Sequence, residues 1–190
     1  MLFNTFTQIP SIPYNIIMAL AVNNENIFKI LKYNTYDCLS QPVLSFKEKM
    51  GLIYKNQDQQ QDYRIFLNPL VENMQYDATT ILKCYRYDIW PKNHLLAVAV
   101  YEFDILFGDK IAMMDYNGIP CNRADVMETE ILKTLNGSVA INGIGQFQFN
   151  ADLSQYCRSR MVLNNTRNYN GSSLFMAVQV GSIDESGCGN

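Results

Sequence analysis

Alternating apolar and polar positions predict one long antiparallel hairpin in the middle of the chain, over residues 79–107. Its turn is expected at the sequence Trp-Pro-Lys-Asn-His, residues 90–94. Side chains alternate between the two faces of a strand, so every second residue of the return strand should share one face. These residues are Leu95, Ala97, Ala99, Tyr101, Phe103, Ile105 and Phe107. Each arm has roughly a dozen residues, about twice the usual length of a strand.

The opposite face of the return strand changes along its length. Leu96, Val98 and Val100 are apolar near the turn, whereas Glu102 and Asp104 further along are acidic. This pattern predicts burial on both faces near the turn and a half-solvated strand beyond it. The outgoing strand should place two sets of side chains on opposite faces, Ile81, Tyr85, Tyr87 and Ile89 on one and Leu82, Cys84, Arg86 and Asp88 on the other.

Helical periodicity predicts helices on both sides of this hairpin in the sequence. The first covers residues 14–22, and Asn24 should cap the second, with Ile27, Phe28, Ile30 and Leu31 as its apolar stripe. Ser45 and Glu48 match a capping box that opens a short helix through residue 53. Asn122 should cap a further helix that ends before Gly137. The stripe suited to cover the hairpin is Ala124, Met127, Ile131 and Leu135.

Several shorter segments have the character of strands. Residues 63–68 precede the hairpin, and their order suggests an antiparallel meander with its two strands. Residues 144–149 read as another strand, and residues 161–163 and 174–180 as a second hairpin. The predicted fold class is therefore α+β, an antiparallel β-sheet with a long central hairpin, N-terminal helices and one helix packed on the sheet.

The length of 190 residues suits one domain, and no repeat or linker divides it. We expect an extended N-terminal arm at residues 1–13, a single α+β domain at residues 14–180 and a flexible tail at residues 181–190. Charged residues make up only 17 %, while there are twelve Tyr and ten Phe. This composition favours a surface that binds partner proteins, where aromatic residues are enriched and Lys and Glu depleted.

Charge and cysteine content exclude several classes of function. The net charge is −3 and no basic run occurs, which disfavours direct binding to nucleic acid. The five cysteines are far apart, so neither a zinc site nor a disulfide framework is indicated. The apolar residues 16–22 follow no Lys or Arg, and we expect a packed helix there rather than a signal peptide. No uncharged window is long enough to span a membrane.

Candidate catalytic residues are few. His94 is the only histidine and lies in the predicted turn, without an orienting partner in the sequence pattern. Glu102 and Asp104 share a strand face and could act as paired carboxylates, so a hydrolase or metal enzyme using these three residues stays an alternative. No nucleophile motif or phosphate-binding loop occurs in the sequence. We expect a protein that is not an enzyme and that needs no metal and no cofactor.

A family resemblance lies in residues 26–33 (Asn-Ile-Phe-Lys-Ile-Leu-Lys-Tyr), in Asp37, Leu39 and Pro42, in the helix over residues 44–53, and in residues 64–69 (Arg-Ile-Phe-Leu-Asn-Pro). These stretches resemble the small head–tail connector proteins of tailed bacteriophages, in particular those with a tail-terminator-like fold. The order of helices and strands is similar too, over residues 24–180. The frequent Asn and Tyr residues look like those of ring proteins in the neck of crAss-like phages.

The resemblance implies a structural virion protein that forms a ring in the phage neck or tail. Such a ring joins the portal to the tail and surrounds the DNA channel. Its partners would be copies of itself, the portal and other neck or tail proteins. Genome DNA would pass without specific binding, and no membrane would be involved. The protein would be made in the cytoplasm of the bacterial host. The alternative is a non-virion binding module, such as an assembly chaperone or host-protein inhibitor.

A ring subunit meets its neighbours through two different surfaces. We expect the subunit interface at the hairpin tip, in the polar loop around residues 57–62 and in the N-terminal arm. The expected interface residues are Trp90, Pro91, Lys92, Asn93 and His94 of the tip, Gln59, Gln60 and Gln61 of the loop, and Phe3 and Phe6 of the arm.

Overall fold

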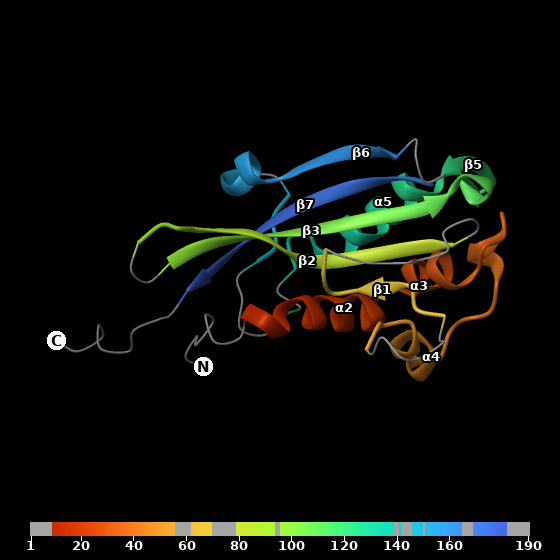
Figure 1. Ribbon diagram of the computed structural model, residues 1–190, viewed down its shortest axis with the longest axis horizontal. Helices are drawn as coiled ribbons and strands as arrows, with labels where there is room; N and C mark the ends of the chain where they lie inside the picture. Colours follow the sequence, from red (N-terminus) through yellow and green to blue (C-terminus); the bar gives the residue numbers. More distant parts are fainter. Residues whose placement is uncertain are drawn as a thin grey trace.

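The computed structural model describes residues 9–55, 62–69, 79–93, 96–138, 141, 146–149, 151–164 and 169–181. Its centre is a five-stranded sheet with the spatial order β1-β2-β3-β7-β6 (Figure 1). These strands are β1 (Ile65–Phe66), β2 (Thr80–Pro91), β3 (Leu96–Gly108), β6 (Arg158–Asn164) and β7 (Tyr169–Gly181). A separate two-stranded sheet pairs β4 (Met113–Tyr116) with β5 (Ile119–Asn122). The fold is α+β, and both predicted hairpins are confirmed.

The helices described are α2 (Ile12–Asn23), α3 (Glu25–Lys32), α4 (Phe46–Gly51) and α5 (Arg123–Leu135), with the 3-10 turns η1 (Ile9–Ser11), η2 (Cys38–Ser40), η3 (Asp109–Ile111) and η4 (Ala151–Tyr156). Three of them, α3, α4 and α5, begin where the sequence predicts their caps. Asn24 accepts the Ile27 N–H at 3.2 Å, and Asn122 accepts the Ala124 N–H at 2.8 Å. The Ser45–Glu48 capping box of α4 is also present.

The main hydrophobic core lies between the helices and one face of the sheet, which we call the inner face. Every second residue of β3 from Ala97 to Phe107 is buried there, as the alternation predicts. The predicted stripe of α5 packs against this face. Leu95 lies outside the described residues. The inner face thus takes the helical cover that an isolated hairpin needs for stability in water.

The predicted meander is wrong, because β1 pairs with β2 in parallel. Ile65 lies opposite Leu82, and Phe66 opposite Lys83. A parallel return needs a connection of about a dozen residues, and residues 67–79 provide that length. The sheet is therefore mixed, with β1 as a very short parallel edge strand.

Two predicted boundaries also change. The chain is already helical at residues 9–13, in η1 and the start of α2, and Ile12 and Pro13 are buried. Proline is favoured in the first turn of a helix, so Pro13 does not keep the chain extended. The extended arm predicted for residues 1–13 is therefore wrong for its last five residues, and residues 1–8 lie outside the described part.

In the strand predicted at residues 144–149, Gln148 makes an isolated bridge to Ala177, while residues 142–145 are not described. In the predicted tail, Gly181 is the last residue of β7 and residues 182–190 are not described.

A β-bulge in β2 reverses the predicted faces of its second half. The register to β3 shifts between Arg86 and Asp88, so Tyr87 is an extra residue. Leu82 and Cys84 face the core before the bulge, whereas Ile89 packs against the core after it. Trp90 consequently packs on the opposite face of the sheet. The predicted assignment of Tyr87 and Ile89 to one face and Asp88 to the other is wrong for this reason.

Candidate functional site

The candidate site lies on the face of the sheet opposite the main core, which we call the outer face. Side-chain alternation and the strand registers determine which residues it presents. They include Lys83, Tyr85, Asp88 and Trp90 of β2, Val98, Val100, Glu102 and Asp104 of β3, Ser173, Phe175 and Ala177 of β7, and Arg158 and Arg160 of β6. Near the hairpin tip η4 packs on this face, and Tyr54 and Tyr63 pack on it at the other end.

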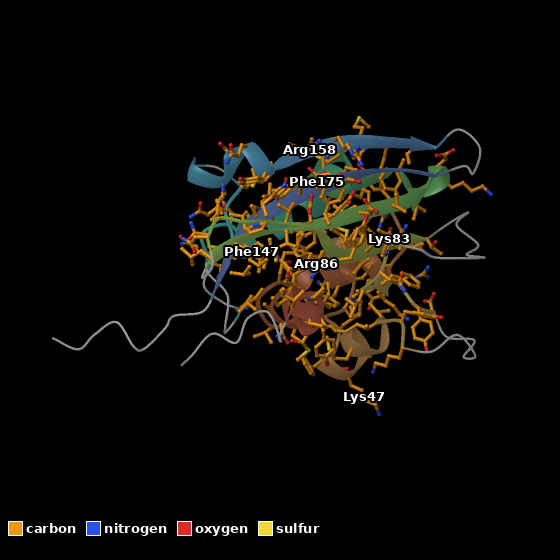
Figure 2. All side chains as sticks on the ribbon, turned by 60° about the vertical axis from the view of Figure 1, so that its left-hand side comes forward. Lys47, Lys83, Arg86, Phe147, Arg158 and Phe175 are labelled. Atoms are coloured by element: carbon orange, nitrogen blue, oxygen red, sulfur yellow. The ribbon has the colours of Figure 1, made fainter. Side chains whose placement is uncertain are left out.

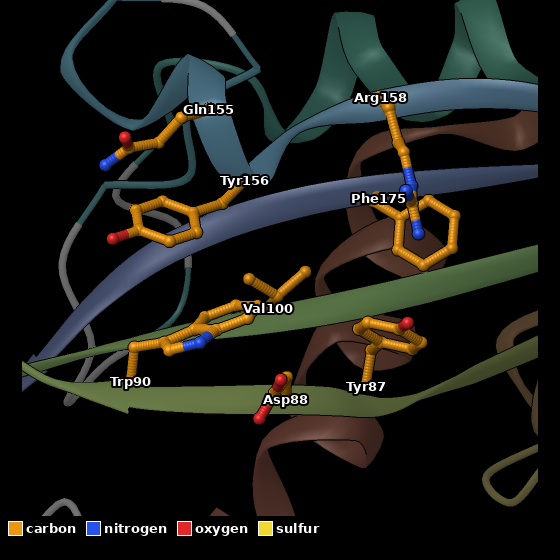
Figure 3. Close-up of a pocket in the computed structure, with 8 residues that line it drawn as sticks. All are labelled: Tyr87, Asp88, Trp90, Val100, Gln155, Tyr156, Arg158 and Phe175. Atoms are coloured by element: carbon orange, nitrogen blue, oxygen red, sulfur yellow. The ribbon is translucent and has the colours of Figure 1, made fainter.

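A pocket of about 410 Å³ opens on the outer face beside η4 (Figure 3). Two aromatic pairs form its walls. Trp90 lies against Tyr156 with ring centroids 4.9 Å apart, and Tyr87 meets Phe175 edge to face at 5.0 Å. Val100 lies between the two pairs in the close-up. The bulge at Tyr87 makes the pocket possible, because it turns Trp90 toward Tyr156 on the outer face.

Cationic side chains stand beside these aromatic rings. The Arg158 guanidinium lies 4.5 Å from the centroid of the Phe175 ring, and Arg160 lies 5.3 Å from it. Figure 2 shows Arg158 and Phe175 next to each other, far from Lys47 on α4. Lys92 Nζ lies 5.0 Å from the Tyr156 ring and donates to the Tyr156 hydroxyl at 2.6 Å. The pocket therefore has aromatic walls and one cationic lining residue, Arg158, while Lys92 and Arg160 contact its aromatic rings.

Asp88 is the acidic residue of the pocket lining. Its Oδ1 accepts the backbone N–H of Ile89 at 2.7 Å, so part of its charge is satisfied locally. Gln155 and Val100 complete the lining. Such a surface suits an apolar side chain between the rings.

Glu102 and Asp104 lie in the middle of the outer face, engaged with their neighbours in the sheet. Asp104 accepts hydrogen bonds from the Tyr85 hydroxyl at 3.1 Å and from the Ser173 hydroxyl. Glu102 Oε1 is 3.7 Å from an Arg160 nitrogen. Burial, reinforced by the neighbouring Asp104 carboxylate, raises the pKa of Glu102 above its ordinary value.

The predicted half-solvated strand is wrong at Glu102, which is only 4 % exposed. Phe175 of β7 lies directly opposite Glu102 in the register, and Arg160 approaches from β6. These neighbours come from strands more than fifty residues later in the chain. Their side chains shield the carboxylate from water.

The structure brings together part of the predicted interface. Trp90 lines the pocket, Lys92 contacts Tyr156, and Asn93 Oδ1 accepts the Leu96 N–H at 2.8 Å. Pro91 ends β2 and is exposed. The other expected interface residues lie outside the described part of the chain, namely His94, Gln59, Gln60, Gln61, Phe3 and Phe6.

Sequence reasoning missed the contribution of η4, β6 and β7 to this site. Arg158 and Arg160 are two residues apart, the spacing that places side chains on one face of a strand. Phe175 lies within the predicted second hairpin. These local signals indicated a shared face, but pairing with the first hairpin depends on contacts distant in sequence.

No group of three or more His, Cys, Asp or Glu side chains that could bind a metal occurs within the described ranges. None of the helices in the described part of the chain is long and apolar enough to cross a membrane.

A known protein family matches most of the chain. The model of the YomW family matches residues 24–178, from the cap of α3 to β7. No curated protein and no solved structure matches the chain. This family match confirms the expectation of a phage-associated protein. Because the match covers most of the sequence, the chain belongs to the YomW family and is a phage-associated protein.

Proposed function

We propose that this chain is a structural protein of the virion, which assembles with copies of itself into a ring in the phage neck or tail. The observation that supports this most is the outer face, where apolar and aromatic side chains remain in contact with solvent. Tyr87 is 48 % exposed and Leu96 is 43 % exposed there. Clustered exposed apolar side chains mark interaction surfaces in soluble proteins.

The shape of the subunit also suits a ring. The tip of the β2–β3 hairpin extends beyond the end of α2 (Figure 1). The two ends of the molecule therefore differ, one formed by the hairpin tip and the other by β4, β5 and the start of α5. Head-to-tail association needs two different surfaces on each subunit, and it closes into a ring where the rotation allows.

The chemistry of the outer face favours a structural role over catalysis. Glu102 and Asp104 make hydrogen bonds and an ion pair with Tyr85, Ser173 and Arg160 of the same sheet. Carboxylates engaged in this way stabilise their strands. A net charge of −3 favours passage of genome DNA without specific binding. The resemblance to connector proteins suggests the portal and other neck or tail proteins as partners.

Native mass spectrometry and negative-stain imaging of the full chain test this proposal, first alone and then with the portal and neck proteins of the same phage. We expect closed rings with one subunit number. Leu96→Ser should weaken assembly, because it removes an exposed apolar side chain at the hairpin tip. Val22→Ser is the matched control, since Val22 is 70 % exposed on α2, outside the outer face.

Subunits that stay monomeric alongside every neck component would contradict the proposal. A one-to-one complex with a single partner absent from virions would instead favour an assembly chaperone or a host-protein inhibitor. Equal assembly of the two variants would show that the hairpin tip is not part of the contact.

A further inference from the structure

We propose that Asn117 is a site of spontaneous covalent modification, at which the side-chain amide is lost and an aspartate or isoaspartate residue remains. Asn117 and Gly118 form the turn between β4 and β5. The reaction takes place within one chain and consumes only water, so it does not depend on the proposed ring.

The reaction joins the backbone of one residue to the side chain of the residue before it. The backbone nitrogen of Gly118 attacks Cγ of Asn117 and forms a new C–N bond. The bond from Cγ to Nδ2 breaks, and Nδ2 leaves as ammonia with the proton that the Gly118 nitrogen gives up. Water then opens the cyclic imide at one of its two carbonyl carbons, which yields aspartate or isoaspartate. Glycine favours the attack because it has no Cβ beside the attacking nitrogen.

The sequence contains four Asn-Gly pairs, whose asparagines are Asn117, Asn136, Asn142 and Asn170. Asn142 lies outside the described residues. Since glycine follows each asparagine, the four pairs should react at similar rates in an unfolded chain. Differences in the folded protein therefore come from the structure around each pair.

The turn at Asn117 leaves both reacting groups open to solvent. Asn117 and Gly118 are exposed, and Tyr116 pairs directly with Ile119, so the Gly118 N–H lies outside the strand ladder. A Cβ built on Gly118 would meet no atom within 4 Å. In the part of the chain that the structure describes, the Asn117 side chain makes no hydrogen bond or ion pair. The two groups can approach each other without displacing a neighbour.

The backbone of this turn also has room to rotate. Asn117 and Gly118 have φ of 56° and 81°, the left-handed conformations of a tight two-residue turn. The two strands that hold the turn have only four residues each and form a sheet of their own. Such a short hairpin opens more readily than a strand in the middle of a large sheet. Opening permits the rotation that brings the Gly118 nitrogen to Cγ of Asn117.

Asn136 is exposed as well, but both of its reacting groups are engaged. Its Oδ1 accepts the Phe149 N–H at 3.0 Å. The Gly137 N–H, which would be the nucleophile, donates to the Phe147 carbonyl at 2.8 Å. Both hydrogen bonds must break before this pair can react.

Asn170 lies within β7, between β3 and β6. Its Nδ2 donates to Asp109 Oδ1 at 2.7 Å, and Gly171 is buried in the sheet. The rotation that would bring the Gly171 nitrogen to Cγ of Asn170 would break the strand pairing on both sides. The structure thus favours Asn117 over the two other described pairs.

Peptide mapping by mass spectrometry tests this site on the purified full-length protein, incubated at mildly alkaline pH. Asn117 should be converted at least about tenfold faster than Asn136 and Asn170, the factor that two ordinary hydrogen bonds represent. In urea the three rates should become similar, because the sequence of each reacting pair is the same. Fragmentation that cleaves the backbone beside the modified residue separates aspartate from isoaspartate, and both should be found.

Gly118→Asn supplies the matched variant. Asparagine tolerates the left-handed conformation of this position, so circular dichroism should match that of the wild type. Its Cβ hinders the attacking nitrogen, and conversion of Asn117 should slow to the rate of Asn136 in the folded protein.

Conversion of Asn136 or Asn170 as fast as that of Asn117 in the folded protein would overturn this assignment. An Asn117 that persists in the folded protein while it reacts in urea would overturn it too. Wild-type rates in Gly118→Asn would show that the loss of the amide does not proceed through the Gly118 nitrogen. None of these results affects the proposed ring, which native mass spectrometry tests separately.

Discussion

The indole ring of Trp90 lies against the ring of Tyr156, with centroids 4.9 Å apart and planes tilted by 31°. This contact joins the end of β2 to η4, two segments far apart in the sequence. Lys92 strengthens the junction by donating to the Tyr156 hydroxyl at 2.6 Å. The hairpin tip and η4 should therefore behave as one cooperative unit on the outer face.

A double-mutant cycle measures this junction. Trp90→Leu and Tyr156→Leu should each destabilise the protein in urea unfolding, and their effects should be non-additive. We expect a coupling free energy of about 0.5–1.5 kcal/mol, the usual contribution of an aromatic pair beyond its buried area. Trp90→Leu combined with Tyr36→Leu is the control, since Tyr36 is exposed and should show additive effects. Additive effects of Trp90→Leu and Tyr156→Leu would show that the two rings are not energetically coupled.

The fully buried Arg123 offers a second test, because its guanidinium holds several loop carbonyls in place. It donates to the carbonyls of Ile111, Ile30, Tyr33 and Thr35 at 2.8–3.1 Å. The carbonyls of residues 30 and 33 lie at the end of α3, where helix acceptors lack intrahelical partners. Burial lowers the pKa of Arg123, with the nearby Cys38 acting in the opposite direction.

Replacing Arg123 with Met keeps much of the volume and removes all of these hydrogen bonds. We expect a loss of about 3 kcal/mol or more in unfolding free energy, since hydrogen bonds to charged groups contribute about 1.5–3 kcal/mol each. The exposed Arg86 supplies the control, and Arg86→Met should change stability by less than about 0.5 kcal/mol. Similar losses in the two variants would show that the buried network contributes little.

The close packing of β7 against β3 can be tested at Gly171, with Gly51 of α4 as the control. A Cβ on Gly171 would lie 1.9 Å from the Ile105 carbonyl oxygen, so β7 and β3 would have to separate. Gly171→Ala should therefore destabilise by about 1–3 kcal/mol, as overpacking does. Gly51→Ala meets no atom within 4 Å and should stabilise α4 by about 0.5–1 kcal/mol. Thermal or urea unfolding distinguishes these opposite signs, and a neutral Gly171→Ala would contradict the close strand contact.

The pH dependence of stability tests the environment of Glu102. Asp104, Tyr85 and Arg160 face this carboxyl group, and burial is the main cause of its raised pKa. A raised folded-state pKa means that stability is lost as the pH rises from the ordinary value of 4.5 through the folded value. Glu102→Gln cannot ionise, so its stability relative to the wild type should increase from about pH 4 to about pH 7.

Glu48 provides the control of opposite sign. A hydrogen bond from Ser45 lowers the pKa of Glu48, so its carboxylate stabilises the fold above its unfolded pKa and this contribution is lost as the pH falls. The stability of Glu48→Gln relative to the wild type should therefore decrease as the pH rises. Urea unfolding at a series of pH values measures both slopes. Slopes of the same sign would contradict the assignment at Glu102.

Local patterns predicted the parts of this fold that depend on neighbours in sequence. The caps at Asn24, Ser45 and Asn122 involve residues within one helical turn, and the buried face of β3 follows from simple alternation. The bulge was not predictable in this way, because nothing in the residues around Tyr87 marks an extra residue in the strand. One such residue reverses every later side chain, and this turns Trp90 to the outer face.

Long-range strand pairing accounts for the other features of the fold that the sequence did not predict. The parallel pairing of Ile65 with Leu82 and the burial of Glu102 by Phe175 depend on which strands become neighbours. Trp90 and Lys92, which belong to the hairpin half of the candidate site, were expected from the sequence as subunit-interface residues, and that role stays a prediction. The other half of the site, Tyr156 and Arg158, comes from a segment whose position follows only from the pairing of β6 with β7.

Peptide mass spectrometry of purified virions tests the structural role most directly. The chain should be present in particles purified from infected cells, in a fixed ratio of many copies to the portal protein. Its peptides should persist after washes that remove loosely bound proteins. If the chain is abundant in lysates of infected cells and absent from the purified virions, the structural role is contradicted.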